Sequence, residues 1–140
     1  MKRLSSCLAV LAAGLALPAT GSGAPTTNGQ ALHCGPGRFT ADIRKGPDQD
    51  LSLAGNLSIT LAASGRVEGA LVHYGKQLNV TGKWHKRSLK LVVHLRSGRS
   101  MTGVGTASRT IGSCADIPRA GTATGPRSGD SGVWGYALGG

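Results

Sequence analysis

The sequence predicts an all-β protein, a small up-and-down antiparallel β-barrel of about eight strands that carries one disulfide. Three observations support this: apolar and polar residues alternate over residues 57–107, glycine-bearing turns interrupt the alternation at nearly even spacing, and two cysteines flank this region. A period of two indicates strands with one buried face, and even spacing indicates consecutive hairpins. Closing the sheet would remove its exposed edges, which favours a barrel over the alternative, a two-sheet β-sandwich.

The five central strands each contribute one set of inward residues. These are Leu57, Ile59, Leu61; Val67, Gly69, Leu71; Leu78, Val80, Gly82, Trp84; Leu89, Leu91, Val93, Leu95; and Met101, Gly103, Gly105, Ala107. Tyr74-Gly75 is predicted to form a two-residue hairpin turn, which places Leu71 opposite Leu78. The same register sets glycines at 69 and 82 opposite valines, as expected for the inside of a small closed sheet.

Two further turns are predicted to be three-residue loops. Residues 63–65 place Leu61 opposite Val67, and residues 97–99 place Leu95 opposite Met101 and Val93 opposite Gly103. The inner glycines at 69, 82, 103 and 105 either complement large side chains or leave a cavity for one small ligand. The sequence leaves both possibilities open.

Three less regular segments complete the eight strands. Residues 38–43 alternate, and residues 121–125 and 133–138 are predicted to form a last hairpin around residues 126–131. The inward residues expected here are Phe39, Ala41, Ile43, Trp134, Tyr136 and Leu138. This pattern of periodicity and glycine spacing resembles that of calycin-type and avidin-like small secreted barrels. The resemblance implies a fold and no ligand.

The N-terminus is predicted to be a Sec-type signal peptide, residues 1–24, that is cleaved on export. Lys2 and Arg3 precede an apolar run over residues 8–17, and small residues follow over residues 19–24. Ten apolar residues are too few to cross a bilayer as a helix, so no transmembrane segment is expected in the mature chain. Residues 25–33 are then a flexible segment and residues 34–140 a single domain, in a protein that is secreted or periplasmic.

Cleavage would remove Cys7 and leave Cys34 and Cys114. An even pair of cysteines in an exported protein predicts a disulfide. This bond would tie the start of the domain to the segment after the central strands.

The charge is strongly basic. The chain carries sixteen Lys and Arg residues against six acidic ones; removing Lys2 and Arg3 leaves fourteen and a net charge of +8. No acidic residue occurs between Glu68 and Asp116. If Trp84 faces Leu89, then two like charges face each other on the outer surface, which destabilises a sheet. The residues predicted to bind a polyanion are Lys76, Lys83, Lys86, Arg87, Lys90, Arg96 and Arg99.

The partner predicted from this charge is an acidic polymer: an acidic polysaccharide, lipopolysaccharide, or extracellular nucleic acid bound without sequence specificity. Such binding would weaken with salt. One alternative is a protein partner; the bacterial periplasmic inhibitors of metalloproteases are similar small exported barrels, and residues 25–33 would correspond to their mobile arm. A further alternative is a carrier of a small ligand inside the barrel.

The sequence favours a non-enzymatic protein that needs no cofactor. The segment Gly129-Asp130-Ser131-Gly132 resembles the nucleophile segment of chymotrypsin-like serine proteases, but Val133 replaces the next glycine and no histidine has that family's local context. The predicted faces separate the histidines, with His73 inward and His94 outward, so no metal site is expected.

Overall fold

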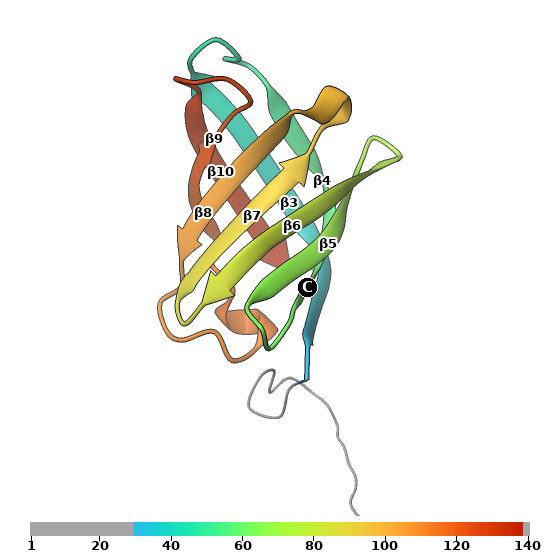
Figure 1. Ribbon diagram of the computed structural model, residues 1–140, viewed down its shortest axis with the longest axis vertical. Helices are drawn as coiled ribbons and strands as arrows, with labels where there is room; N and C mark the ends of the chain where they lie inside the picture. Colours follow the sequence, from blue (N-terminus) through green and yellow to red (C-terminus); the bar gives the residue numbers. More distant parts are fainter. Residues whose placement is uncertain (1–29, 139–140) are drawn as a thin grey trace, which may run out of the picture.

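The computed structural model describes residues 30–138, and the predicted signal peptide, most of the segment 25–33 and residues 139–140 lie outside them. Eight antiparallel strands follow one another in chain order and close into a barrel, as the sequence predicts (Figure 1). The strands are β3 (Leu32–Lys45), β4 (Ser52–Leu61), β5 (Arg66–His73), β6 (Lys76–His85), β7 (Ser88–His94), β8 (Ser100–Thr106), β9 (Ala120–Thr124) and β10 (Ser131–Leu138).

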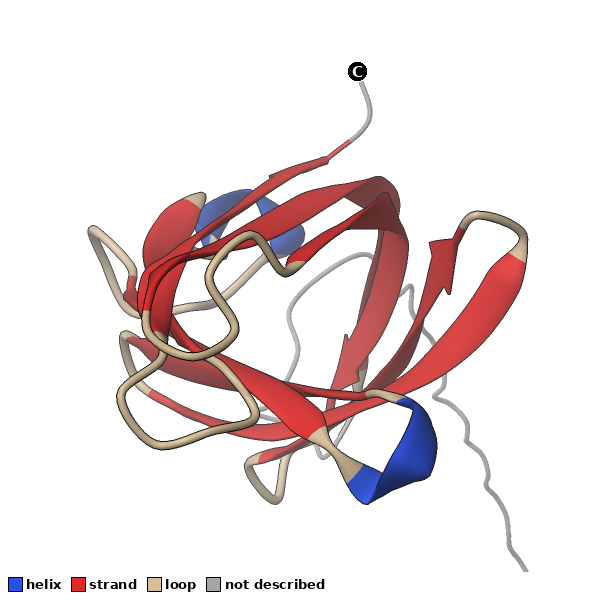
Figure 2. Cartoon of the chain, turned by 90° about the horizontal axis from the view of Figure 1, so that it is seen from above, coloured by secondary structure: helices blue, strands red, loops and turns tan. Residues whose placement is uncertain are grey.

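Two 3-10 turns, η1 (Arg96–Gly98) and η2 (Cys114–Asp116), lie in the β7–β8 and β8–β9 connections. Within the part of the chain that the structure describes, no helix has the length and apolar character needed to cross a membrane. Figure 2 shows the strands as a ring around the interior, seen from above.

The barrel closes where β10 pairs with both β3 and β9. Trp134 lies opposite Ala41 of β3 and opposite Gly121 of β9. The inward residues that the alternation predicts for β3 and β10 are buried, with 4% of the surface or less exposed at Phe39, Ala41, Ile43, Trp134 and Tyr136. Leu138 differs, because the last described residue lies at the barrel rim and keeps 36% of its surface exposed.

The two hairpin registers around β5 are as predicted. Leu71 lies opposite Leu78, and Leu61 opposite Val67. Tyr74 and Gly75 both have positive φ angles, 48° and 76°. Two consecutive positive φ angles define the type I′ turn, whose twist matches that of the flanking strands.

The register predicted for the β7–β8 hairpin is wrong by two residues. Met101 lies opposite Val93 and not opposite Leu95, and Gly103 lies opposite Leu91. The backbone N–H of Leu95 donates to the carbonyl of Arg99 at 2.8 Å, so the three-residue loop covers residues 96–98 and starts one residue earlier than predicted. Because the shift is two residues, every side chain stays on its predicted face.

Strand β3 is longer than predicted. It begins at Leu32, and its first residues pair with β4, since Leu32 lies opposite Leu61 and His33 opposite Thr60. The Gly35-Pro36 peptide bond is cis, and the register shifts between Cys34 and Gly37. A bulge of this kind lets the strand continue past Pro36, which has no backbone N–H to donate to the neighbouring strand.

The inner glycines of β8 accommodate the largest side chain of the core. A Cβ atom on Gly103 would lie 2.9 Å from Cδ1 of Trp134, and one on Gly105 would lie 2.8 Å from its Cζ2. The Trp134 ring stacks on Phe39 with centroids 6.1 Å apart. In this part of the interior the glycines therefore complement large residues and do not leave space for a ligand.

Candidate polyanion-binding surface

Three basic residues lie directly opposite one another on three neighbouring strands. Arg66 of β5 faces Lys83 of β6, and Lys83 faces Lys90 of β7. All three are exposed on the outside of the barrel, because their strand neighbours Val67, Leu89 and Leu91 point inward. Adjacent strands are about 4.8 Å apart, so the row extends over about 10 Å.

The β6–β7 turn adds two further basic residues at the end of this row. Lys86 and Arg87 form the two-residue turn, and Lys86 has a φ angle of 54°. The backbone of Ile111 donates to the Lys86 carbonyl at 2.9 Å, and Nε of Arg87 donates to the Ala107 carbonyl at 2.8 Å. The β8–β9 connection therefore holds the turn in place. We call Arg66, Lys83, Lys86, Arg87 and Lys90 the basic cluster.

Carboxylates neutralise little of the basic cluster. Arg66 forms an ion pair with Glu68 at 2.6 Å, and both side chains are well exposed, so the pair adds little stability. Among residues 30–138, no carboxylate lies within ion-pair distance of the other four members. Four of the five cations are thus available to an anion from solution.

The basic cluster borders a shallow surface depression of about 430 Å³. It extends from the β4–β5 turn across β6 and β7 to β8, and its lining residues include Arg66, Lys83, His85, Ser88, Lys90 and Val104. Val104 is 47% exposed beside Lys90, which it faces across the β7–β8 pair. No acidic residue lines the depression, so an anion placed there meets only cations, neutral polar groups and apolar surface.

The remaining predicted residues lie at the other end of the barrel. Lys76 starts β6, and Arg96 and Arg99 lie in the β7–β8 connection, whereas the basic cluster surrounds the β6–β7 turn (Figure 1). Lys83 lies seven positions after Lys76 along β6, which is about 23 Å along an extended strand. The seven predicted residues therefore form two separate groups; we call Lys76, Arg96 and Arg99 the distal group.

One member of the distal group lies near a cluster that joins the loops at this end. Arg99 is 4.0 Å from Asp48, and Arg127 donates two hydrogen bonds to the same carboxylate at 2.9 and 3.0 Å. The hydrogen bonds from Arg127 are the main cause of a lowered pKa of Asp48, to about 2. Asp48 thereby connects the β3–β4, β7–β8 and β9–β10 loops and offsets part of the distal charge.

The segment that resembles a protease nucleophile loop has a structural role. Asp130 is buried, and its carboxylate accepts hydrogen bonds from the backbone N–H groups of Asp48 at 2.7 Å and Arg127 at 3.0 Å. Ser131 begins β10 and is exposed. A buried carboxylate that satisfies backbone donors stabilises the turn before the last strand.

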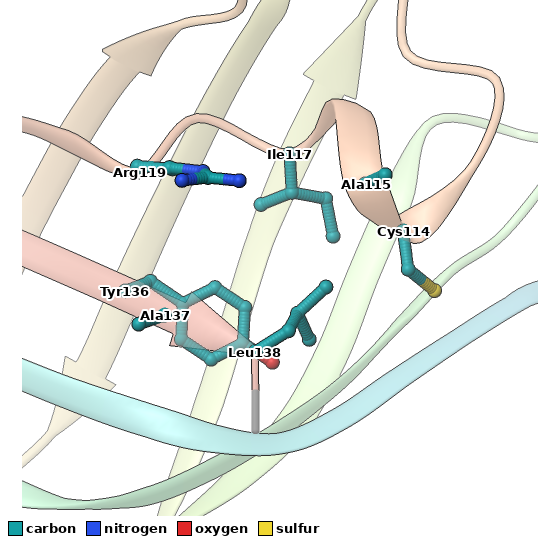
Figure 3. A pocket seen from close by; sticks show the side chains of 7 residues that line it. All are labelled: Cys114, Ala115, Ile117, Arg119, Tyr136, Ala137 and Leu138. Carbon is teal, nitrogen blue, oxygen red and sulfur yellow. The ribbon is translucent and has the colours of Figure 1, made fainter. Parts of the chain in front are cut away.

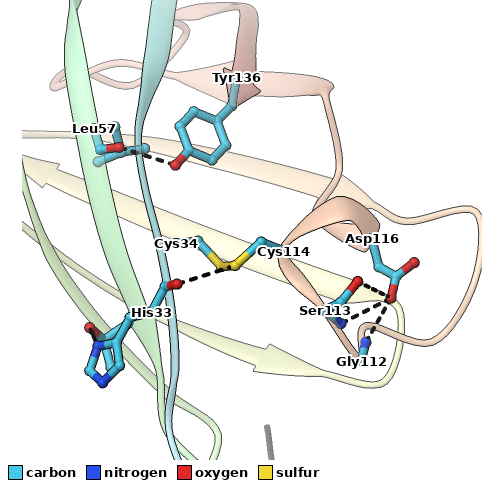
Figure 4. Close-up of a disulfide and its surroundings, with 9 residues drawn as sticks. His33, Cys34, Leu57, Gly112, Ser113, Cys114, Asp116 and Tyr136 are labelled. Carbon is cyan, nitrogen blue, oxygen red and sulfur yellow. Dashed lines mark hydrogen bonds between the residues drawn. A yellow bond between two sulfur atoms is a disulfide. The ribbon is translucent and has the colours of Figure 1, made fainter. Parts of the chain in front are cut away.

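The predicted disulfide between Cys34 and Cys114 is present, with Cα atoms 5.5 Å apart, and it joins β3 to η2 (Figure 4). Asp116 organises this turn by accepting hydrogen bonds from the backbone N–H groups of Gly112 and Ser113, each at 3.0 Å. The bond from Gly112 is the main cause of a lowered Asp116 pKa. The β8–β9 connection, which supports the β6–β7 turn, is thus itself held to the barrel.

A pocket of about 130 Å³ lies beside η2, between Ile117, Arg119, Tyr136 and Leu138 (Figure 3). The Tyr136 hydroxyl donates to the carbonyl of Leu57 at 3.1 Å (Figure 4), and burial raises its pKa to about 12. This hydroxyl stays protonated and joins β10 to β4, so its role is structural.

Two of the histidines each contact the hydroxyl of one threonine. Nδ1 of His33 lies 2.9 Å from the Thr60 hydroxyl, and Nε2 of His94 lies 2.8 Å from the Thr81 hydroxyl. Over the described residues, no three His, Cys, Asp or Glu side chains gather in a way that could hold a metal ion.

Arg66 is the one member of the basic cluster that is not among the residues predicted from the sequence. The register predicted around Tyr74-Gly75 already places Val67 opposite Gly82, and the residue before Val67 therefore faces Lys83.

Comparison of the chain with protein-family models, with curated proteins and with solved structures found no significant match.

Proposed function

We propose that this protein is exported and acts, without catalysis, as a binding protein that holds an acidic polymer on the basic cluster. The observation that carries the proposal is the row of Arg66, Lys83 and Lys90 on three neighbouring strands, with one carboxylate beside it. The signal-like residues 1–24 support a secreted or periplasmic location, where acidic envelope components and extracellular polymers occur.

The energetics of the row support an anionic partner. Like charges placed directly opposite each other in a sheet destabilise it. Neutral residues such as threonine would avoid this repulsion and still suit a strand. A bound polyanion would attract all three cations of the row and offset the repulsion between them, so the arrangement is favourable in the complex.

The shape of the surface supports recognition of charge and not of a base sequence. Tyr74, the one aromatic residue with a largely exposed side chain on the described surface, lies at the distal end of β5. Trp84 lines the depression beside the basic cluster, but it is half-buried and its Nε1–H donates to the Ala62 carbonyl at 2.8 Å. The described part of the basic cluster therefore has no exposed Trp, Tyr or Phe ring on which a base could stack. The polymer class is an acidic polysaccharide, lipopolysaccharide or nucleic acid bound through its phosphates or carboxylates, and a long polymer would also reach the distal group.

The salt dependence of binding tests this proposal. The probes are heparin, lipopolysaccharide and a short DNA duplex, each labelled and titrated with the oxidised mature protein. Neutralising about three phosphates gives a slope of about −3 in a plot of log affinity for duplex DNA against log salt, or roughly a 40-fold loss between about 50 and 200 mM salt. Binding that does not change with salt would contradict the proposal.

A pair of variants with equal net charge localises the binding. Lys83→Glu/Lys90→Glu changes the charge of the basic cluster, and Arg38→Glu/Lys45→Glu makes the same change on β3, across the barrel from β6 and β7 in strand order. All four side chains are exposed. The first variant should lose at least about tenfold in affinity at low salt, while the second should change little. Equal losses would show that the net charge alone attracts the polymer.

A further inference from the structure

Strand β6 continues beyond the last residue of β7 with which it pairs. On one side, β6 pairs with β5 over the whole stretch from Lys76 to Lys83. On the other side, its pairing with β7 ends at the pair formed by Val80 of β6 and Val93 of β7. Residues 76–79 therefore have a strand partner on one side and none on the side of β7. Among the described residues, no backbone hydrogen bond outside the ladders connects them to the β7–β8 connection.

The two views agree with this separation. The β5–β6 turn projects from the barrel wall, apart from the β7–β8 turn that contains η1 (Figure 1, Figure 2). Lys76 pairs with His73 across the two-residue turn, and hydrogen-bonded residues alternate along an antiparallel pair, so the peptide groups of Gln77 point away from β5. Strand β6 thus keeps a short open edge on its β7 side, which can accept another strand.

An exposed aromatic residue stands at the end of this edge. Tyr74 is 87% exposed, and its φ angle of 48° lies in the left-handed region, which favours glycine or asparagine. Its ring contacts that of His73 edge-on, with centroids 4.5 Å apart, but the side chain gains little from burial in the free protein and its backbone conformation is unfavourable. Such outliers gather at functional sites, and tyrosine is among the residues that dominate protein–protein interfaces.

The charge around the edge selects the partner. Lys76 begins the edge and Arg96 lies in the neighbouring turn, and neither forms an ion pair within residues 30–138. No acidic residue occurs in the sequence from 69 to 115. A second copy of this basic chain would bring like charges together, whereas an extended acidic segment would be attracted.

We propose that the β6 edge at residues 76–79 binds an extended acidic segment of a partner protein by strand addition, with Tyr74 as an aromatic contact beside it. The side chains of the edge alternate as such binding requires: Gln77 and Asn79 are exposed, and Leu78 is half-buried against the core. Main-chain hydrogen bonds would supply affinity, and the basic residues would supply selectivity. This site is separate from the basic cluster and does not depend on polymer binding there.

Three synthetic peptides test the proposal with the full mature protein. The first alternates glutamate and valine, the second replaces glutamate by lysine, and the third is the acidic peptide with the backbone nitrogens of all its central residues methylated, which removes the donors of both edges. The acidic peptide should bind at least about tenfold more tightly than either control. Binding of the methylated peptide that is as tight as that of the acidic peptide, or no binding of the acidic peptide, would overturn the proposal.

Variants and amide exchange place the contact. Gln77→Pro removes the backbone N–H that points away from β5 and should abolish binding of the acidic peptide. The protein should still fold, because proline is tolerated at strand edges. Gln77→Thr keeps the N–H and should retain binding. Amide exchange at Gln77 should be rapid in the free protein and slow with the acidic peptide, a measurement that needs no variant. Loss of binding in Lys83→Glu/Lys90→Glu would assign the peptide to the basic cluster and refute the edge site. A wild-type dimer that Gln77→Pro converts to a monomer would show that a second copy occupies the edge.

Discussion

Tyr74 and Lys86 occupy positive-φ positions in two turns where glycine, asparagine or aspartate is the usual residue. Both belong to surfaces for which a partner is proposed, Tyr74 beside the open edge of β6 and Lys86 within the basic cluster. The residue type at each position therefore adds a contact group where a purely structural turn would have a smaller side chain. This is the pattern expected when function outweighs local stability at single residues.

The substitution Tyr74→Asn tests this at the residue scale. Asparagine followed by Gly75 is among the preferred sequences of a type I′ turn, and the tyrosine side chain is 87% exposed, so little burial is lost. The free energy of unfolding should rise by about 0.5–1 kcal/mol. Urea denaturation measures it, with Gly75→Ala as a control that should destabilise because Gly75 has a φ angle of 76°. A less stable Tyr74→Asn protein would mean that the ring contributes to the fold.

Asp48 predicts how stability depends on acid. The hydrogen bonds from Arg127 hold its pKa at about 2 in the folded protein, below the ordinary 3.8. A lowered folded-state pKa stabilises the fold above the ordinary pKa, and this contribution is lost as pH falls from about 4 to about 2. Calorimetry should show a steeper fall in the melting temperature over this window for the wild type than for Asp48→Asn. Parallel curves for the two proteins would contradict the assignment.

At the scale of strands and turns, the sequence predicts most of the barrel. Alternation identifies the inward face throughout, and Tyr74-Gly75 sets the β5–β6 register correctly. The predicted β7–β8 register is wrong because it makes Gly98 the second residue of its three-residue loop. In the structure Gly98 is the third residue, as Gly65 is in the β4–β5 loop, and both glycines have positive φ angles. The third position of such loops is the left-handed one, so the same rule gives both registers.

Other features of the elements depend on contacts that a one-dimensional pattern does not contain. The early start of β3 depends on pairing with β4 across a register shift between Cys34 and Gly37. The open edge of β6 arises because β7 ends first, and the ion pair that offsets Arg66 requires two exposed side chains on one strand to meet. The position of the basic cluster was predictable from register, whereas the ion pair between Arg66 and Glu68 was not.

The disulfide links two distant elements and predicts a large effect on stability. Cys34 and Cys114 are 80 residues apart, and closing a loop of this length restricts the unfolded chain by roughly 4–5 kcal/mol in the chain-entropy treatment. The double substitution Cys34→Ser/Cys114→Ser should lower the free energy of unfolding by that order, measured in urea. The wild type under reducing conditions is the control and should show a similar loss. A loss below about 1 kcal/mol would show that the reduced chain keeps the ends together by other contacts.

At the scale of the whole molecule, the barrel separates two kinds of surface. The basic cluster surrounds the β6–β7 turn at one end, supported by the β8–β9 connection and the disulfide. The open edge and the distal group lie at the other end, next to loops that Asp48 and Asp130 hold together. A rigid closed sheet keeps both surfaces in fixed positions, which allows one small protein to hold a polymer and contact a partner protein.

The most direct test of the central proposal is an amide chemical-shift titration of the oxidised mature protein with a heparin fragment at low salt. The account predicts that shifts gather at Arg66, Lys83, Lys86, Arg87 and Lys90 and in the surrounding turns, and that added salt reverses them. Shifts spread evenly over the basic surface, or confined to the distal group, would contradict the proposed site. An unchanged spectrum would contradict the proposed function.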